Sequence, residues 1–100
     1  MDTLTNIVQR EIAGYTGKGL NGYSYLVANS DHQAFTVVSV GYMDGQRYAS
    51  ADLIVRLIAD RVVIERDDNY PPLVDALMQA GVPRDNIILA YAGEPVPETA

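Results

Sequence analysis

The chain has 100 residues, the length of one domain, and its composition of 48% hydrophobic and 20% charged residues excludes an intrinsically disordered protein. It contains no cysteine, which excludes disulfides, thiolate catalysis and zinc sites built on sulfur. The formal net charge is −6, and residues 60–100 alone carry 8 acidic and 3 basic side chains, a field that repels phosphate backbones and favours a basic partner.

Membrane and targeting segments are not expected. No run approaches the roughly 18 apolar residues that a membrane helix needs. The N-terminal stretch MDTLTNIVQREIAG lacks the long apolar core of a signal peptide. Together with the absence of cysteine, these features predict a cytoplasmic protein without membrane contact.

The first predicted element is a helix. Leu4, Ile7, Val8 and Ile12 recur at helical spacing, Asp2 or Thr3 is available as the N-cap, and Gly14 is a stop signal. Residues 14–22 hold four glycines and are expected to form a flexible loop.

Strand patterns follow from residue 23 onward. Residues 23–28 alternate with a period of two, and residues 34–42 are rich in β-branched side chains. The Asp-Gly pair after the second run predicts a hairpin. Residues 47–59 are almost continuously apolar and fit either a buried helix or a central strand. We interpret them as a strand, because residues 59–61 resemble a tight turn into the next apolar run.

The resulting sheet is predicted to be a meander of four antiparallel strands, with an apolar side that faces the helices. Its other face would carry tyrosines, which are common at protein interfaces. The alternative is that these side chains cap the edges of the core. The candidates are Tyr23, Tyr25, Tyr42, Tyr48 and Tyr91.

The second helix has the clearest boundaries. Pro71 and Pro72 suit a first helical turn, Gly81 suits the position after the last turn, and Pro83 prevents continuation. A short apolar strand is expected at residues 87–91, and the tail from Gly93 is expected to fray. An apolar strand, a helix and a second apolar strand in this order predict a β-α-β unit. We therefore expect one α+β domain over residues 1–100, with both helices on one face of the sheet.

Three short motifs suggest chemistry, and each has a simpler interpretation. Residues 17–22, GKGLNG, match G-x-G-x-x-G, but the expected helix precedes and the strand follows, which inverts the phosphate-binding context. Ser39 in VVSVG lies within a strand, where no nucleophile elbow forms, and His32, the only histidine, lies in a polar turn. Glu65, Asp67 and Asp68 are acidic, yet their spacing does not fit a calcium loop. An exposed strand end followed by a solvated loop is the simpler interpretation of this charge run. No metal or cofactor is expected.

With these elements placed, the chain resembles the XisI family, the small fdxN-element excision controlling factors of cyanobacteria. The resemblance spans residues 2–95. It is carried by VVSVGY at 37–42, by the strand pair around 58–65 and, most specifically, by DALMQAGVPRDNIILAYAGE at 75–94. An arginine that members often carry after the last strand is missing here.

The resemblance implies an α+β domain that is not an enzyme. It implies a role with a XisH-like, nuclease-like partner in controlling excision of a DNA element during heterocyst differentiation. The acidic second half would meet the partner's basic surface. The residues expected to contribute to partner binding are Asp67, Asp68, Asn69, Tyr70, Tyr91 and Glu94.

Further expectations concern binding. The alternative function is a small-molecule sensor or enzyme with a pocket between helix and sheet. The tyrosine face and the sheet edges, left without cover, predict a homo-oligomer. Direct binding of duplex DNA is not expected, because the 7 cationic residues are dispersed and form no cluster of three.

Overall fold

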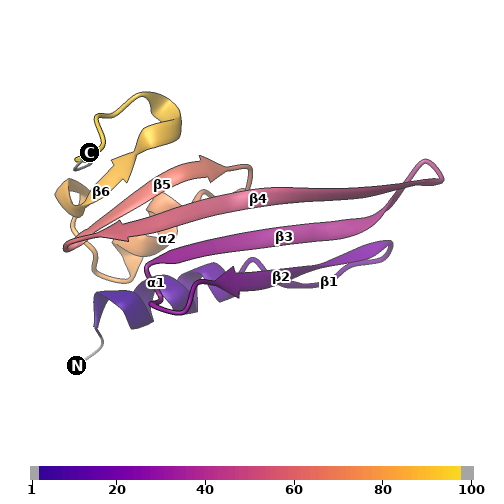
Figure 1. Cartoon of the computed structure of the whole chain (residues 1–100), viewed down its shortest axis with the longest axis horizontal. Coiled ribbons are helices and arrows are strands. Elements are labelled where there is room, and N and C mark those ends of the chain that lie inside the picture. The colour runs from indigo at the N-terminus through magenta and orange to yellow at the C-terminus, as the bar shows by residue number, and fades with distance from the viewer. Residues whose placement is uncertain (1–2, 98–100) are drawn as a thin grey trace.

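A computed structural model describes residues 3–97 and has an α+β fold, as the sequence predicts (Figure 1). Two α-helices and two 3₁₀ turns accompany a six-stranded sheet. In chain order the elements are α1 (Leu4–Ala13), β1 (Gly17–Lys18), β2 (Gly22–Ala28), β3 (Ala34–Met43), β4 (Gln46–Ile58), β5 (Arg61–Asp67), α2 (Leu73–Gln79), η1 (Arg84–Asn86), β6 (Ile87–Leu89) and η2 (Ala90–Ala92).

The sheet order follows the chain order from β1 to β6. Neighbours from β1 to β5 are antiparallel, whereas β6 lies parallel to β5. A parallel pair needs a crossover, and α2 supplies it, which confirms the predicted β-α-β unit. The ambiguous run at residues 47–59 is a strand. The predicted loop at residues 14–22 is wrong in part, because Gly17 and Lys18 pair with Ser24 and Tyr23 and add a strand to the sheet.

Each helix has a local reason to begin where it does. At α1 the Thr3 side chain accepts a hydrogen bond from the backbone N–H of Asn6 at 3.2 Å, so Thr3 is the N-cap. At α2 the N-cap is Pro72, whose side chain offers no hydrogen bond. The acceptor for the first amide of α2 comes instead from Asp67 at the end of β5.

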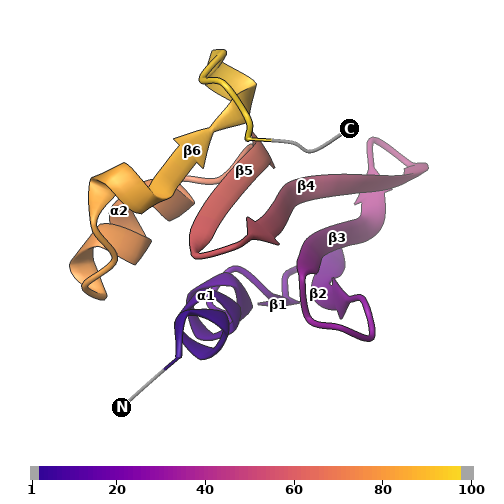
Figure 2. The same ribbon diagram turned by 60° about the vertical axis from the view of Figure 1, so that its left-hand side comes forward.

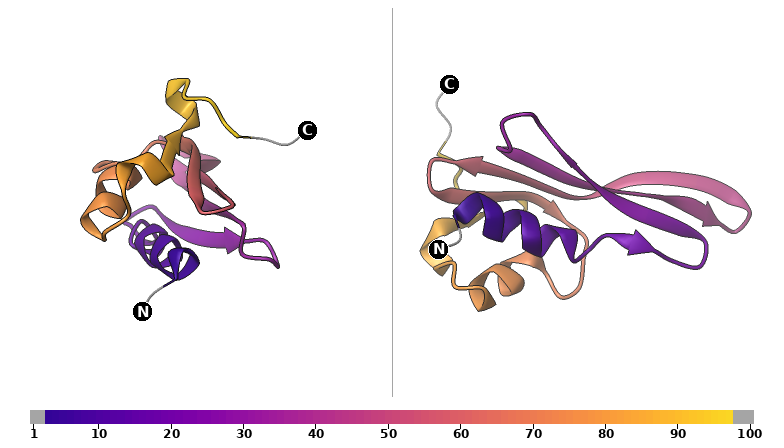
Figure 3. Two further views of the ribbon diagram at one scale, coloured as in Figure 1. Left: turned by 90° about the vertical axis from the view of Figure 1, so that its left-hand side faces the viewer. Right: turned by 90° about the horizontal axis from the view of Figure 1, so that it is seen from below.

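The core lies between one face of the sheet and both helices. Figures 2 and 3 show α1 and α2 side by side against that face. Apolar side chains from both helices meet those of the strands there, and burial of this kind is the main stabilising term of a small domain. The members that are least exposed to solvent are Val8, Ile12, Phe35, Val37, Leu53, Val55, Val62, Ile64, Leu73, Leu77 and Ile87.

The far half of the β3–β4 hairpin extends beyond the helices (Figure 1). The pairing of β3 with β4 shifts between Val37 and Val38, so Asp52 has no partner residue on β3 and forms a β-bulge. A bulge bends its strand and re-aims a side chain, here that of Asp52.

The expected single tyrosine face is wrong in part. Tyr23 and Tyr25 pair with Val40 and Val38, on the face away from the helices. Tyr48 pairs with Gly41, which lies four residues after the core residue Val37 on β3 and therefore on the same face, so Tyr48 lies on the helix-side face. The remaining candidates also separate, with Tyr42 beside Tyr23 and Tyr25 on the outer face and Tyr91 outside the sheet in η2.

Candidate functional site

The first predicted partner-binding residue, Asp67, is a structural residue. It is the last residue of β5, and its side chain is partly buried. One carboxylate oxygen accepts hydrogen bonds from the backbone and side-chain nitrogens of Asn69, at 2.9 and 3.0 Å, and the other accepts from the backbone N–H of Leu73 at 2.7 Å. We had expected Asp67 in a solvated loop, and this expectation is wrong. Asp67 closes the turn after β5 and starts α2.

The next three predicted residues lie in the turn between β5 and α2. Asp68 is exposed and forms a surface ion pair with Arg66 at 2.8 Å. Asn69 turns back toward Asp67. Tyr70 is 95% exposed. Asp68 and Tyr70 are therefore accessible to a partner, whereas Asn69 is engaged within the turn.

Tyr91 lies in an acidic environment. Burial raises the pKa of its phenol, and the carboxylate of Asp67 raises that pKa further. Asp75 and Glu94 also raise the pKa of Tyr91, whereas the Arg84 guanidinium lowers it. Tyr91 lies in η2, which packs against β5, so the fold brings it toward Asp67 at the end of that strand.

A second tyrosine, Tyr15, lies near the same carboxylates and was not predicted from the sequence. Its hydroxyl donates a hydrogen bond to the carbonyl oxygen of Pro71 at 2.7 Å, which ties the end of α1 to the start of α2. Burial, followed by the charges of Asp67, Glu11 and Asp75, raises its pKa to about 12.

Glu94, the last predicted residue, closes the outer edge of β6. Its side chain accepts hydrogen bonds from the backbone N–H of Leu89 at 2.9 Å and from Arg84 at 2.6 Å. These two bonds lower the pKa of Glu94, the bond from Leu89 more strongly. The backbone N–H of Glu94 donates to the carbonyl of Leu89 at 3.2 Å. The expected fraying from Gly93 onward is therefore wrong for Glu94, and residues 98–100 lie outside the described part of the chain.

The remaining edge groups of β6 are satisfied in the same way. Arg84 donates from its side chain to the carbonyl of Ile87 at 2.7 Å, and the N–H of Ile87 donates to the carbonyl of Arg84. All four backbone polar groups of Ile87 and Leu89 thus have partners within residues 84–94. An edge strand closed like this offers no template to a second chain.

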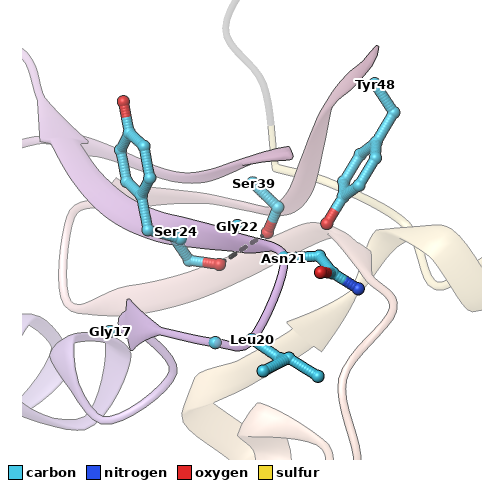
Figure 4. Close-up of a pocket in the computed structure, with 9 residues that line it drawn as sticks. Gly17, Leu20, Asn21, Gly22, Ser24, Ser39 and Tyr48 are labelled. Carbon is cyan, nitrogen blue, oxygen red and sulfur yellow. Dashed lines mark hydrogen bonds between the residues drawn. The ribbon is translucent and has the colours of Figure 1, made fainter. Parts of the chain in front are cut away.

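A pocket of about 340 Å³ lies elsewhere, at the far half of the sheet (Figure 4). It lies between the glycine-rich loop and strands β2 to β4, and no helix lines it. It is therefore not the pocket between helix and sheet that the alternative function would use. The residues that line the pocket are Gly17, Gly19, Leu20, Asn21, Gly22, Tyr23, Ser24, Ser39 and Tyr48. Two of the short sequence motifs lie at this pocket, GKGLNG and Ser39 of VVSVG.

Two glycines make the wall of this pocket possible. A Cβ atom on Gly41 would lie 2.5 Å from the carbonyl oxygen of Asn21 and 3.0 Å from the hydroxyl oxygen of Tyr48. A Cβ atom on Gly22 would lie 2.2 Å from the carbonyl oxygen of Val40. The loop and Tyr48 can therefore lie against the strands only because both positions lack a side chain.

Serine hydroxyls form a network on the floor of the pocket. Ser24 and Ser39 lie opposite each other on β2 and β3, with hydroxyl oxygens 2.7 Å apart. Ser39 donates a short hydrogen bond to Asp52, and Ser50 donates to the other Asp52 oxygen at 2.7 Å. Ser39 therefore lies within a strand and is hydrogen-bonded to a carboxylate. The other candidate, His32, lies in the β2–β3 turn, and its ring is 6.5 Å from that of Phe35.

The acidic run at residues 65–68 does not form a cation site. Glu65 pairs with Arg56 at 2.7 Å, and Asp67 is bonded to Asn69 and Leu73. Within residues 3–97 no group of three potential ligands is placed to hold a metal ion. Over the same residues, no helix is long and apolar enough to cross a membrane.

These features define a small α+β domain in which two helices cover one face of a mostly antiparallel sheet. The family model described as XisI protein matches residues 1–99, so the chain belongs to the XisI family. No curated protein matches the chain significantly.

Two solved structures share the fold. A XisI-like protein from Anabaena variabilis ATCC 29413 superposes with a TM-score of 0.66 and 14% identity, covering 86% of this chain and 78% of that chain. The fdxN element excision controlling factor XisI from the same organism gives a TM-score of 0.55 and 18% identity, covering 88% and 81%. At these identities the similarity establishes the fold alone.

Proposed function

We propose that this chain is a non-enzymatic controlling factor for excision of a DNA element, and that it acts in the cytoplasm by binding a XisH-like nuclease partner. The observation that carries the proposal is membership of the XisI family, one of whose structural relatives is described as an fdxN element excision controlling factor. The partner follows from the family resemblance and from the charge of this chain.

The surface chemistry supports a basic protein partner. Asp68 and Asp75 are exposed near the start of α2, and Tyr70 between them is almost fully accessible. Tyrosine next to carboxylates provides apolar area and a negative field on one surface. A nuclease-like protein needs a positive path for DNA, and that path is complementary to this surface.

Two of the residues predicted to bind the partner, Asp67 and Glu94, are needed for the fold, so we propose a smaller contact surface. Asp67 and Glu94 are engaged in hydrogen bonds that hold the fold, so their carboxylates offer a partner little free bonding capacity. We therefore assign the contact to Asp68, Tyr70 and Asp75, with the exposed edge of Tyr91 beside them.

Co-purification tests this assignment. The tagged chain is co-expressed with the XisH-like protein of its own genome, as wild type and with Asp68→Asn plus Asp75→Asn. We expect the wild type to retain the partner and the double variant to retain several-fold less, because two attractive charges are lost. Asp31→Asn plus Asp44→Asn, the same loss of two charges in the exposed β2–β3 and β3–β4 turns, is the control and should behave as wild type.

Three results would count against the proposal. Absence of the XisH-like protein from every preparation would reject the partner. Equal retention by the wild type and the double variant would reject the assigned surface. Equal losses in the double variant and in the Asp31→Asn plus Asp44→Asn control would show that only overall charge matters.

A further inference from the structure

The pocket beside the glycine-rich loop has a floor whose hydrogen-bonding direction is fixed. A serine hydroxyl has one hydrogen to donate and two lone pairs. Ser39 gives its hydrogen to Asp52, because a carboxylate only accepts. In the 2.7 Å contact between the two serines, Ser24 must therefore be the donor.

The same rule applies to Ser50, which gives its hydrogen to the second oxygen of Asp52. Hydroxyls on β2, β3 and β4 thus all direct their hydrogens toward one carboxylate. The Ser24 oxygen therefore presents only lone pairs to the pocket. It is connected to the charged Asp52 carboxylate through two successive hydrogen bonds, by way of Ser39. Such chains polarise each other, so the Ser24 oxygen is a better acceptor than an isolated hydroxyl.

From this arrangement we propose that the pocket binds the guanidinium or ammonium group of an arginine or lysine side chain from a partner protein. Both groups donate several hydrogen bonds and accept none, which matches a floor of acceptors. A phosphate would meet lone pairs and a negative charge, so this G-x-G-x-x-G loop does not suit an anion. The inference uses only the pocket, and it is independent of the identity of the partner proposed above.

The walls also suit a long cationic side chain. The Tyr48 hydroxyl points toward Asn21 and the pocket, with Ser39 between Tyr48 and Ser24 (Figure 4). Tyr48 lines the pocket and is 37% exposed, so its aromatic ring is available to a cation that enters there. At the rim, Leu20 is 98% exposed and can pack against the aliphatic stem of an arginine or lysine.

The test is a titration of ¹⁵N-labelled protein, followed by NMR. The probes are N-acetyl-arginine amide and its neutral isostere, N-acetyl-citrulline amide, which has the same length but no charge. We expect the arginine probe to give saturable shifts in the amides of residues 17–24, Ser39 and Tyr48. The citrulline probe should bind about fivefold more weakly or worse, because the charge-assisted hydrogen bonds are lost.

Asp52→Asn tests the origin of the preference. The amide removes the charge and donates to one of the two serines, so the floor no longer favours a cation. Affinity for the arginine probe should fall about fivefold or more. The matched control is Asp44→Asn, an equal charge change in the β3–β4 turn, where asparagine suits the positive φ of 53°. The control should bind as wild type.

Each other outcome overturns the inference. It fails if the pocket amides do not shift, if citrulline binds as well as arginine, or if Asp52→Asn binds as well as the control. If Asp52→Asn loses the native spectrum, Ser24→Ala replaces it, because that change removes the facing acceptor and leaves the Asp52 bonds to Ser39 and Ser50 in place. Unchanged arginine binding by Ser24→Ala then rejects the inference.

Discussion

At the scale of single residues, the two neighbouring aspartates after β5 have different roles. The sequence predicts a charged, solvated loop at residues 65–70, and charge runs usually are such loops. In the structure Asp67 accepts three hydrogen bonds, one of them from an amide six residues later, whereas the side chain of Asp68 forms an exposed ion pair with Arg66. The adjacent letters are identical, so only the three-dimensional path of the turn distinguishes them.

This difference predicts unequal effects on stability. Asp67→Ala should lower the free energy of unfolding by about 2 kcal/mol, because partly buried amides lose a charged acceptor. Asp68→Ala should change it by about 0.5 kcal/mol or less, as expected for an exposed ion pair. Urea denaturation of both variants and the wild type gives the comparison. Equal losses in the two variants would contradict the structural role of Asp67.

At the scale of elements, the sequence was most informative where hydrophobic period and stop signals agree. The first helix, the long strands and the β-α-β unit were predicted on that basis. The two-residue strand β1 was missed, because glycines and a lysine carry no strand pattern. The acceptor chain from Ser24 to Asp52 was also missed. It depends on a bulge that places Asp52 beside Ser39, and a bulge is an offset between two strands that one strand's sequence does not encode.

The last strand, β6, depends on Glu94 for closure of its edge, which predicts a dependence on pH. Hydrogen bonds from Leu89 and Arg84 hold the pKa of Glu94 below its usual value of 4.5. A lowered pKa means that the ionised group stabilises the fold above the unfolded-state value, and that this contribution is lost as the pH falls through the folded-state value. Glu94→Gln should therefore be less stable than the wild type at neutral pH.

The difference in free energy of unfolding between the wild type and Glu94→Gln should stay constant down to about pH 4.5 and narrow below it, since only the wild type loses the contribution of Glu94. Urea midpoints measured at a series of acidic pH values provide the test. Parallel pH profiles for the wild type and Glu94→Gln would show that Glu94 is not held in its charged form by the β6 edge.

At the scale of the whole molecule, one face of the sheet is covered by helices and much of the other is open. On the open face Tyr23 is 50% and Tyr25 is 41% exposed, and their rings are 5.9 Å apart. Because the β6 edge is closed, we expect association through this face and not by extending the sheet at β6. A two-fold pairing of identical faces is the commonest arrangement.

We predict that the purified protein is a homo-oligomer, most simply a dimer, at micromolar concentration. Tyr23→Lys combined with Tyr25→Lys should shift it to monomer, because four like charges would meet in a two-fold interface. Tyr70→Lys, in the turn before α2, is the control and should remain associated. Light scattering coupled to size exclusion measures the mass. A wild-type monomer across the micromolar range would contradict the prediction.

We propose that this XisI-family chain is an acidic protein-binding domain that associates electrostatically with a XisH-like partner. The most direct test is the association rate of the two purified proteins over a range of salt concentrations. We predict a rate that falls steeply with ionic strength, and a slower rate for Asp68→Asn plus Asp75→Asn at low salt. A rate that does not respond to salt or to these substitutions, or no association at all, would contradict it.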